Sequence, residues 1–118
     1  MSMSMPQPHP RIVAVEVSPS RIDVSPESLR VSRDTEVVWR IDIERFPANS
    51  TVSIHVKFPL TSPFKRNGFA ATARTDSAGN ADATVSAGEA KNKGLHKYDV
   101  EIVSNGRKLK VDPWIEVD

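Results

Sequence analysis

One stretch near the C-terminus constrains the fold more than any other, because residues 95–111 have the pattern of a β-hairpin. Asn105 and Gly106 lie at its centre. This pair readily adopts positive φ at both central positions, which suits a two-residue type I′ turn. Such a turn sets the register of the two strands, so that Ile102 faces Leu109.

The two faces of this hairpin differ in polarity. Val100 faces Val111, and Tyr98 shares their apolar face. On the opposite face Glu101 meets Lys110, an opposite-charge pair that suits a solvated surface. A hairpin with one apolar face buries that face against a second layer, which predicts a β-sandwich.

Two further segments alternate between apolar and polar residues with the period of two that a strand requires. In residues 35–43 the apolar side is formed by Val37, Trp39, Ile41 and Ile43, and in residues 50–58 by Val52, Ile54, Val56 and Phe58. The β-branched side chains among them favour strand over helix. Trp39 is predicted to fill the centre of the core.

The rest of the folded chain divides into short predicted strands separated by turns. Residues 69–75 and 80–86 form a predicted alanine-rich hairpin around residues 76–79, and no segment has the pattern of a stable helix. We therefore predict an all-β fold, an antiparallel Greek-key sandwich of about seven or eight strands. The predicted core consists of Trp39, Ile41, Val52, Ile54, Val56, Tyr98, Val100, Ile102, Leu109 and Val111.

The chain has 118 residues, which suits one domain with one core. We predict a single domain over residues 11–118 and a disordered tail over residues 1–10, where three prolines and alternating serine and methionine leave little to bury. Soft ligands that Cu(I) would accept occur in this tail, namely Met1, Met3, Met5 and His9. A solvated tail is the favoured interpretation, because soft ligands without a rigid frame select poorly.

Charge and hydropathy argue against two classes of partner. Sixteen basic and fifteen acidic residues are interleaved and leave a formal charge of +1, so no global field indicates nucleic acid or an anionic membrane. The C-terminal part is locally basic, but only Tyr98 is available there to stack on a base, and lysines also protect a sheet edge. No stretch has the length of a membrane span or the pattern of a signal peptide, so a cytoplasmic location is expected.

Residues 24–41 resemble the opening of cupredoxin-like domains. In that family an apolar strand leads through a proline turn to a hydrophobic pair, then to a turn ending in Asp-Thr and to Val-x-Trp, all of which occur here. Residues 95–100 resemble the penultimate strand of the family, and residues 111–117 resemble its closing strand. The resemblance implies a Greek-key sandwich, with immunoglobulin-like sandwiches, which share these patterns, as the near alternative.

The blue-copper chemistry of that family needs two histidines, a cysteine thiolate and usually a methionine. This chain has no cysteine, and no methionine follows Met5. His55 falls on the outward face of its strand, and His96 has no visible partner in the sequence. The resemblance therefore implies a copper-free member to which no family ligand can be carried over, so neither a cofactor nor electron transfer is expected.

Constellations that would support catalysis or a metal site are scarce. The absence of cysteine excludes thiolate chemistry, and no motif for a serine nucleophile or a phosphate loop occurs. Asp42 and Glu44 share an outward strand face, where solvated charge explains them better than acid–base chemistry. The oxygen ligands of Asp76, Asn80 and Asp82 would suit calcium, but these residue types also favour turns. We predict no enzyme, no catalytic residue and no metal site.

The preferred contact site is Phe64 with Lys65 and Arg66. An aromatic side chain on a loop beside two cations suits a peptide, a sugar or an acidic surface. The interpretation favoured over this contact role is that Phe64 caps an open end of the sandwich, since apolar loop residues usually cover a core.

The leading functional hypothesis is a non-catalytic binding or structural module that engages a protein partner through its loops. A carbohydrate- or small-ligand-binding module is the second hypothesis, and it requires Phe64 and Trp114 to be exposed together. A metal-binding cupredoxin-like protein with an unusual site is the third.

Overall fold

A computed structural model describes residues 9–118 of the chain, and these residues form eleven strands and no helix. The strands are β1 (Arg11–Ser18), β2 (Arg21–Ser25), β3 (Ser28–Val31), β4 (Glu36–Ile43), β5 (Thr51–Lys57), β6 (Gly68–Arg74), β7 (Ala81–Glu89), β8 (Gly94–Lys97), β9 (Asp99–Ser104), β10 (Arg107–Val111) and β11 (Trp114–Val117). The described part of the chain has no helix that could cross a membrane. Most of the predicted N-terminal tail, including the three methionines, lies outside the described residues, and β1 begins at Arg11.

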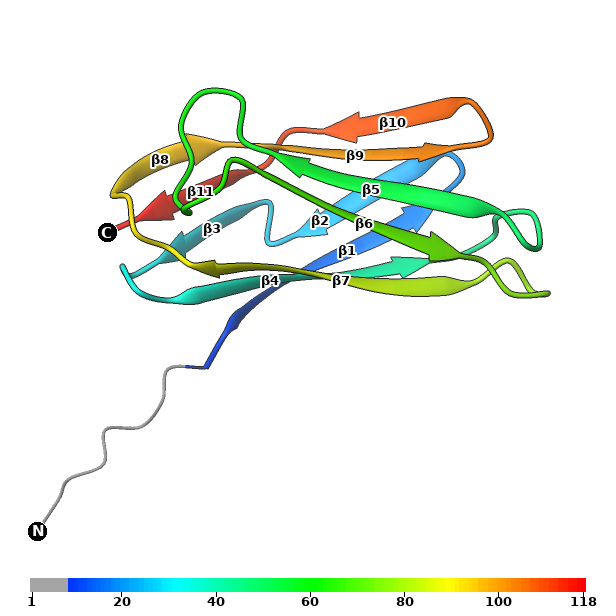
Figure 1. Ribbon diagram of the computed structural model, residues 1–118, viewed down its shortest axis with the longest axis horizontal. Coiled ribbons are helices and arrows are strands. Elements are labelled where there is room, and N and C mark those ends of the chain that lie inside the picture. Colours follow the sequence, from blue (N-terminus) through cyan, green and yellow to red (C-terminus); the bar gives the residue numbers. More distant parts are fainter. Residues whose placement is uncertain (1–8) are drawn as a thin grey trace, which may run out of the picture.

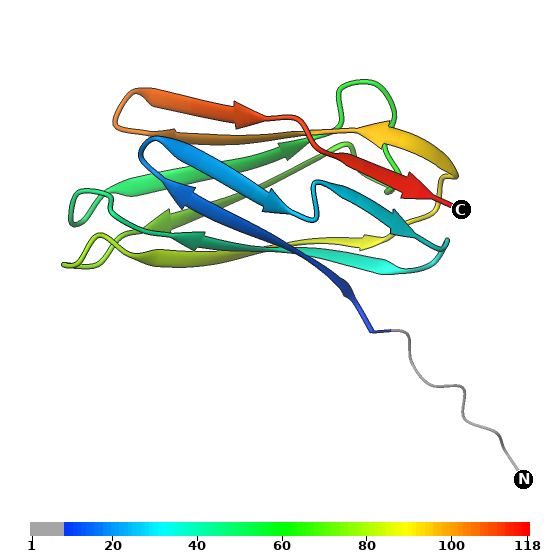
Figure 2. The ribbon, with the colours of Figure 1, turned by 180° about the vertical axis from the view of Figure 1, so that it is seen from behind.

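Two four-stranded sheets face each other across one core (Figure 1). Their strand orders are β2-β1-β4-β7 and β10-β9-β5-β6, and a three-stranded sheet, β3-β11-β8, extends one end. Seen from behind, the three-stranded sheet lies at the end of the sandwich that holds the C-terminus (Figure 2). The prediction of an all-β sandwich is confirmed. The segments outnumber the predicted strands because bends split β2 from β3 and β8 from β9, and two pairs, β1–β4 and β3–β11, are parallel.

The predicted C-terminal hairpin is confirmed in its register. Ile102 lies opposite Leu109, and the turn residues Asn105 and Gly106 have φ values of 52° and 76°. The expected pairing of Glu101 with Lys110 across a solvated face is wrong in one respect. Glu101 does lie opposite Lys110, but it is buried and its carboxylate accepts from the ammonium groups of two other lysines.

Glu101 is held by Lys57 at 2.9 Å and by Lys108 at 3.2 Å. The hydrogen bond from Lys57, supported by Lys108, lowers the pKa of the Glu101 carboxyl although burial opposes this shift. Two long lysine stems cover the carboxylate while their charged ends stay half exposed, which explains how an acidic side chain is tolerated on a covered strand.

Trp39 lies at the centre of the core, as predicted, and is fully buried. Its Nε1 donates a hydrogen bond to the Tyr98 hydroxyl at 3.2 Å, and the rings of Phe58, Phe64 and Phe69 surround it with centroids 5.9–6.4 Å away. The predicted core residues are buried except Leu109 and Val111. These two are half-buried because β10 is the outermost strand of its sheet.

The predicted hairpin of residues 69–75 and 80–86 is wrong. β6 pairs with β5, whereas β7 pairs with β4 in the other sheet. The turn between them crosses from one sheet to the other, and both strands are sheet edges, so their small alanine side chains lie along one open side of the sandwich.

Alkaline pH is expected to destabilise the fold through Tyr98. Burial raises the pKa of its hydroxyl from the ordinary value of 10.0 to about 12, with the Trp39 hydrogen bond opposing the shift. The unfolded chain therefore ionises first: the contribution of Tyr98 is complete below pH 10.0 and is lost as the pH rises to about 12, a change of about 2–3 kcal/mol in the free energy of unfolding.

Because Tyr98 is the only tyrosine of the chain, the ultraviolet absorbance of tyrosinate reports on this group alone. We expect the absorbance to rise together with the loss of near-ultraviolet circular dichroism. In the Tyr98→Phe variant this alkaline loss should disappear, while stability at neutral pH falls by about 1–3 kcal/mol because the Trp39 N–H is left unpaired. Ionisation at the ordinary pH in a chain that stays folded would contradict the burial of this hydroxyl.

Candidate binding site

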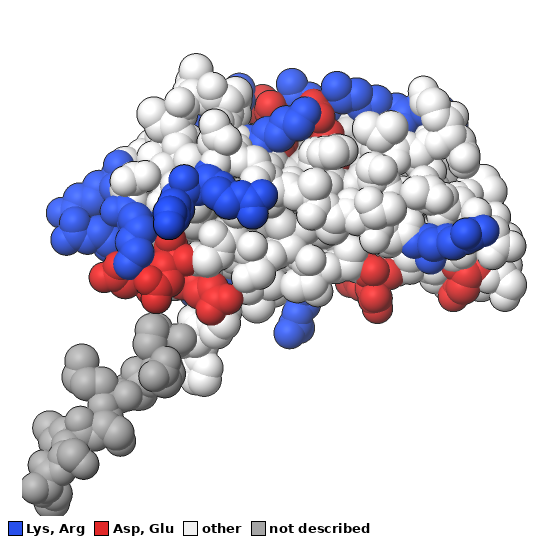
Figure 3. Space-filling model, in the orientation of Figure 1, with Lys and Arg blue, Asp and Glu red and all other residues white. Residues whose placement is uncertain are grey.

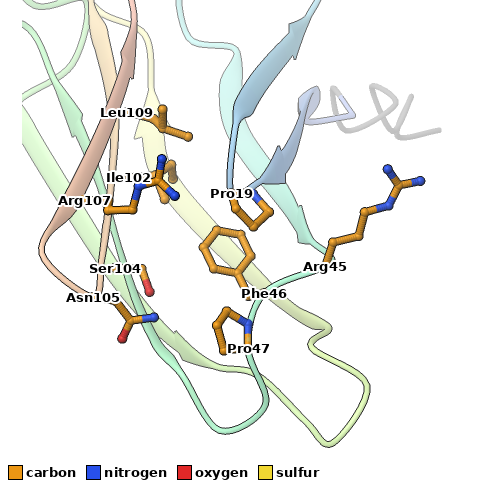
Figure 4. A pocket seen from close by; sticks show the side chains of 9 residues that line it. All are labelled: Pro19, Arg45, Phe46, Pro47, Ile102, Ser104, Asn105, Arg107 and Leu109. Atoms are coloured by element: carbon orange, nitrogen blue, oxygen red, sulfur yellow. The ribbon is translucent and has the colours of Figure 1, made fainter.

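An apolar pocket of about 460 Å³ opens at the end of the sandwich where three connections meet (Figure 4). These connections are the β1–β2 turn, the β4–β5 loop and the β9–β10 hairpin. We call it the loop-end pocket, and its lining residues are Pro19, Arg45, Phe46, Pro47, Ile102, Ser104, Asn105, Arg107 and Leu109. The described lining contains no histidine and no carboxylate.

The β4–β5 loop forms one wall of the loop-end pocket, and its backbone is anchored by hydrogen bonds. The Phe46 N–H donates to the Gly79 carbonyl at 3.2 Å, and the Pro47 carbonyl accepts from the Thr75 hydroxyl at 2.7 Å. Arg45, directly before Phe46, has a φ of 64°, a conformation that is uncommon for a residue of its size. The loop is thus held in a bent form that presents the half-buried Phe46 ring to the pocket.

The β9–β10 hairpin forms the opposite wall. Its two-residue turn puts Leu109 on the core side of β10, where it lies opposite Ile102, and Leu109 is half-buried. Ser104 is tied to the neighbouring strand, since its hydroxyl donates to the Thr51 carbonyl at 2.9 Å. The hydroxyl of Ser104 is therefore occupied, and it ties this wall to the strand β5.

Two arginines border the loop-end pocket, but only one faces it. Arg107 lies two residues before Leu109 on the same side of β10, and its side chain extends over the hollow in Figure 4, whereas Arg45 points away from the other lining residues. Among residues 9–118 neither arginine forms an ion pair. An apolar hollow beside an exposed guanidinium suits an apolar side chain that is followed by a carboxylate.

The structure separates the three residues of the predicted contact site, Phe64, Lys65 and Arg66. Phe64 is 2% exposed and packs on Trp39, Phe58 and Phe69, so it caps the core from the β5–β6 loop. Lys65 and Arg66 are exposed and border a separate hollow beside Glu89 and Lys91.

The requirement of the carbohydrate hypothesis, that Phe64 and Trp114 be exposed together, is not met. Trp114 is 38% exposed on the three-stranded sheet, where the ammonium group of Lys97 lies 5.9 Å from its ring centroid. Phe64 is buried inside the sandwich. The two aromatic side chains therefore do not form a shared platform.

The polar candidates have structural roles. The Asp76 carboxylate accepts hydrogen bonds from the backbone N–H groups of Ala78 and Asn80, both at 2.9 Å, as a turn requires. Buried His96 lies between the Thr61 hydroxyl at 2.7 Å and the Asn92 carbonyl at 2.9 Å. No group of three or more His, Cys, Asp or Glu side chains in residues 9–118 could hold a metal ion.

The predicted solvated carboxylate Asp42 is exposed and belongs to a row of like charges. Asp82 on β7 and Glu16 on β1 are its partners in the register of the two neighbouring strands. Like charges that face each other across strands lower stability slightly, which is tolerable where all of them reach water.

The lining residues of the loop-end pocket were not among the predicted site residues. They come from three segments that are far apart in the sequence, and no local pattern links them. Two local signals were present: Phe46 is an aromatic residue in a loop between two strong strands, and Pro19 and Pro47 stiffen neighbouring connections. Such signals identify a pocket only once the pairing of the strands is known.

Solved structures with a similar fold include a copper protein. The chain is similar to auracyanin A, a "blue" copper protein from the green thermophilic photosynthetic bacterium Chloroflexus aurantiacus, with a TM-score of 0.44 and 14% sequence identity. The match covers 93% of this chain and 100% of that chain. No protein-family model matches the sequence, and no curated protein matches it.

Proposed function

We propose that this domain is a non-catalytic binding module that engages a protein partner at the loop-end pocket. The observation that carries the proposal is an apolar hollow, open to solvent, whose walls come from three connections fixed by the strands behind them. Concave, mostly apolar hollows bordered by a few polar groups are the usual form of ligand-binding sites. Rigid walls favour recognition of an apolar side chain, because little conformational entropy is lost on binding.

The chemistry of the lining supports binding rather than catalysis. The lining has one hydroxyl, that of Ser104, and it already donates to the Thr51 carbonyl. No lining residue is a histidine or a carboxylate that would accept a proton from it. The charged group over the hollow is a guanidinium, which stays protonated and pairs with carboxylates.

A second candidate function is the binding of a small apolar carboxylic acid. The volume of the loop-end pocket, about 460 Å³, falls within the range of small-molecule sites. Arg107 would hold the carboxylate in this case as well. The two candidates differ in whether the ligand continues beyond the pocket along the protein surface.

A displayed library of random peptides, selected on the immobilised chain, tests the proposal. Selected peptides should shift the amide resonances of Phe46, Ser104 and Leu109, and should bind the Leu109→Lys variant about tenfold or more weakly. Leu60→Lys is the matched control, because Leu60 is 82% exposed in a different loop, and it should bind like the parent chain.

Selected peptides that map to another surface, or that bind both variants equally, would contradict the proposal. A parallel screen of small aromatic and aliphatic carboxylic acids separates the two candidates. If such acids shift the same resonances and no peptide can be selected, the small-ligand function replaces the protein-binding one.

A further inference from the structure

The strand β10 leaves one of its backbone edges unpaired. It is the terminal strand of its sheet and pairs only with β9. In a two-residue hairpin the residues that flank the turn bond to each other, so Arg107, Leu109 and Val111 direct their N–H and C=O groups toward β9. The backbone groups of Lys108 and Lys110 therefore face outward. A free edge of this kind can accept another extended segment as a further strand.

The free edge of β10 borders a partly apolar seam between the two four-stranded sheets. β2 is the terminal strand of the opposite sheet, and Figure 2 shows β2 and β10 along the same side of the sandwich. We call the space between them the β2–β10 seam, which is lined by the apolar residues Ile22, Val24, Leu109 and Val111. Val24, Leu109 and Val111 are only half-buried, so part of their apolar surface reaches water.

Two hollows follow each other along this seam. The loop-end pocket includes Leu109, and a second hollow of about 220 Å³ includes Val111, two residues further along the same side of β10. This spacing is that of successive same-face positions in a strand. The second hollow is also bordered by the carboxylates of Asp23, Glu27 and Asp112, so an apolar side chain suits it and an acidic one does not. An extended segment beside β10 would place alternate side chains above the two hollows.

The outer face of β10 is rich in positive charge, as Figure 3 shows along the upper edge of the molecule. The ammonium groups of Lys57 and Lys108 share the Glu101 carboxylate, and Lys110 lies 3.6 Å from the carboxylate of Asp99. On this face three ammonium groups thus meet two carboxylates, which leaves a surplus of positive charge. The side chains of a strand added to this edge would face these lysines at every second position.

We propose that the partner presents an extended acidic segment that pairs with β10 as an additional strand. The proposal rests on the proposed function, since the same segment would place an apolar side chain in the loop-end pocket. Its pattern is acidic–apolar–acidic: carboxylates face Lys108 and Lys110 on the outer side, and the residue between them enters the seam beside Leu109. Main-chain bonds supply affinity and the alternation supplies specificity.

A second copy of the chain is a poorer occupant of this edge. Pairing β10 with another β10 brings the lysines and Arg107 of the two strands together, and like charges on neighbouring strands repel. The lysines thus protect the edge against self-association while they favour an acidic strand.

Amide hydrogen exchange with a capped peptide of alternating glutamate and valine residues tests this proposal on the intact chain. On addition of the peptide, exchange of the Lys108 and Lys110 amides should slow about tenfold or more, because they become hydrogen-bonded. A peptide that is N-methylated at alternate residues should bind about tenfold more weakly, since it lacks the donors of the new ladder. A peptide with lysine in place of glutamate should not bind.

Unchanged exchange at Lys108 and Lys110 would overturn the strand addition. If peptides from the random library still shift the resonances of the loop-end pocket in that case, the proposed function stands and only the mode of recognition is refuted. Equal binding of the glutamate and lysine peptides would overturn the acidic chemistry. Slowed exchange that depends on protein concentration without peptide would identify a second copy as the occupant, which also overturns the proposal.

Discussion

Replacing Phe64 by alanine is expected to lower the free energy of unfolding by about 3–5 kcal/mol, as for other large aromatic residues in a core. Phe64 is 2% exposed, and its ring centroid lies 5.9 Å from that of Trp39, 5.6 Å from Phe58 and 5.8 Å from Phe69. Three edge-to-face contacts would be lost together with the buried area. The space left would collapse only in part, because Trp39 and Phe69 are held in different strands, β4 and β6. Urea denaturation measures the loss as a lower midpoint at an unchanged slope.

Leu60→Ala is the matched control for this substitution. Leu60 lies in the same β5–β6 loop but is 82% exposed, so its truncation should change stability by less than about 0.5 kcal/mol. If the Phe64→Ala chain were as stable as the Leu60→Ala chain, Phe64 could not be a core residue. In that case Phe64 could again belong to a contact site with Lys65 and Arg66.

The position of Phe64 shows where inference from sequence stops in this chain. Residues 59–67 have no periodic pattern that would assign their side chains to a face, so only the general tendency of apolar loop residues to cover a core favours a cap over a contact for Phe64. The strands are different. In β4 and β5 every second side chain is β-branched or aromatic, and this alternation alone places Trp39 and Ile54 in the core.

Pairing between distant strands is the other part that local patterns leave undetermined. Asp76 and Gly79 form the same kind of tight turn whether the chain returns within one sheet or crosses to the other, so the predicted hairpin was wrong although its turn was correctly located. The type I′ hairpin at Asn105 succeeded because a two-residue turn is too short for any crossing. The loop-end pocket forms where connections from both sheets meet. Its lining therefore could not be predicted before the pairing of the strands was known.

Gly79→Ala is expected to lower the free energy of unfolding by about 2–5 kcal/mol, the combined effect of strain and overlap. Gly79 has a φ of 80°, a conformation that favours glycine, and a Cβ at this position would overlap the backbone carbonyl oxygen of Phe46. Backbone cannot move aside as the end of a flexible side chain can. The β4–β5 loop would have to shift, which would break the bond from the Phe46 N–H to the Gly79 carbonyl.

Gly88→Ala separates the two causes, because Gly88 has a φ of 81° but no atom within 4 Å of the added Cβ. The free energy of unfolding of this variant should fall by only about 1–2 kcal/mol, the cost of a positive φ in a residue with a Cβ. The difference between the two variants in chemical denaturation thus measures the contact between Gly79 and Phe46, and equal losses of stability would show that the contact does not constrain the loop.

The same contact holds one wall of the loop-end pocket. The Gly79→Ala chain should therefore bind the selected peptides more weakly than the parent chain, under conditions where it is still folded. Gly88→Ala, at the opposite end of β7, should bind them normally.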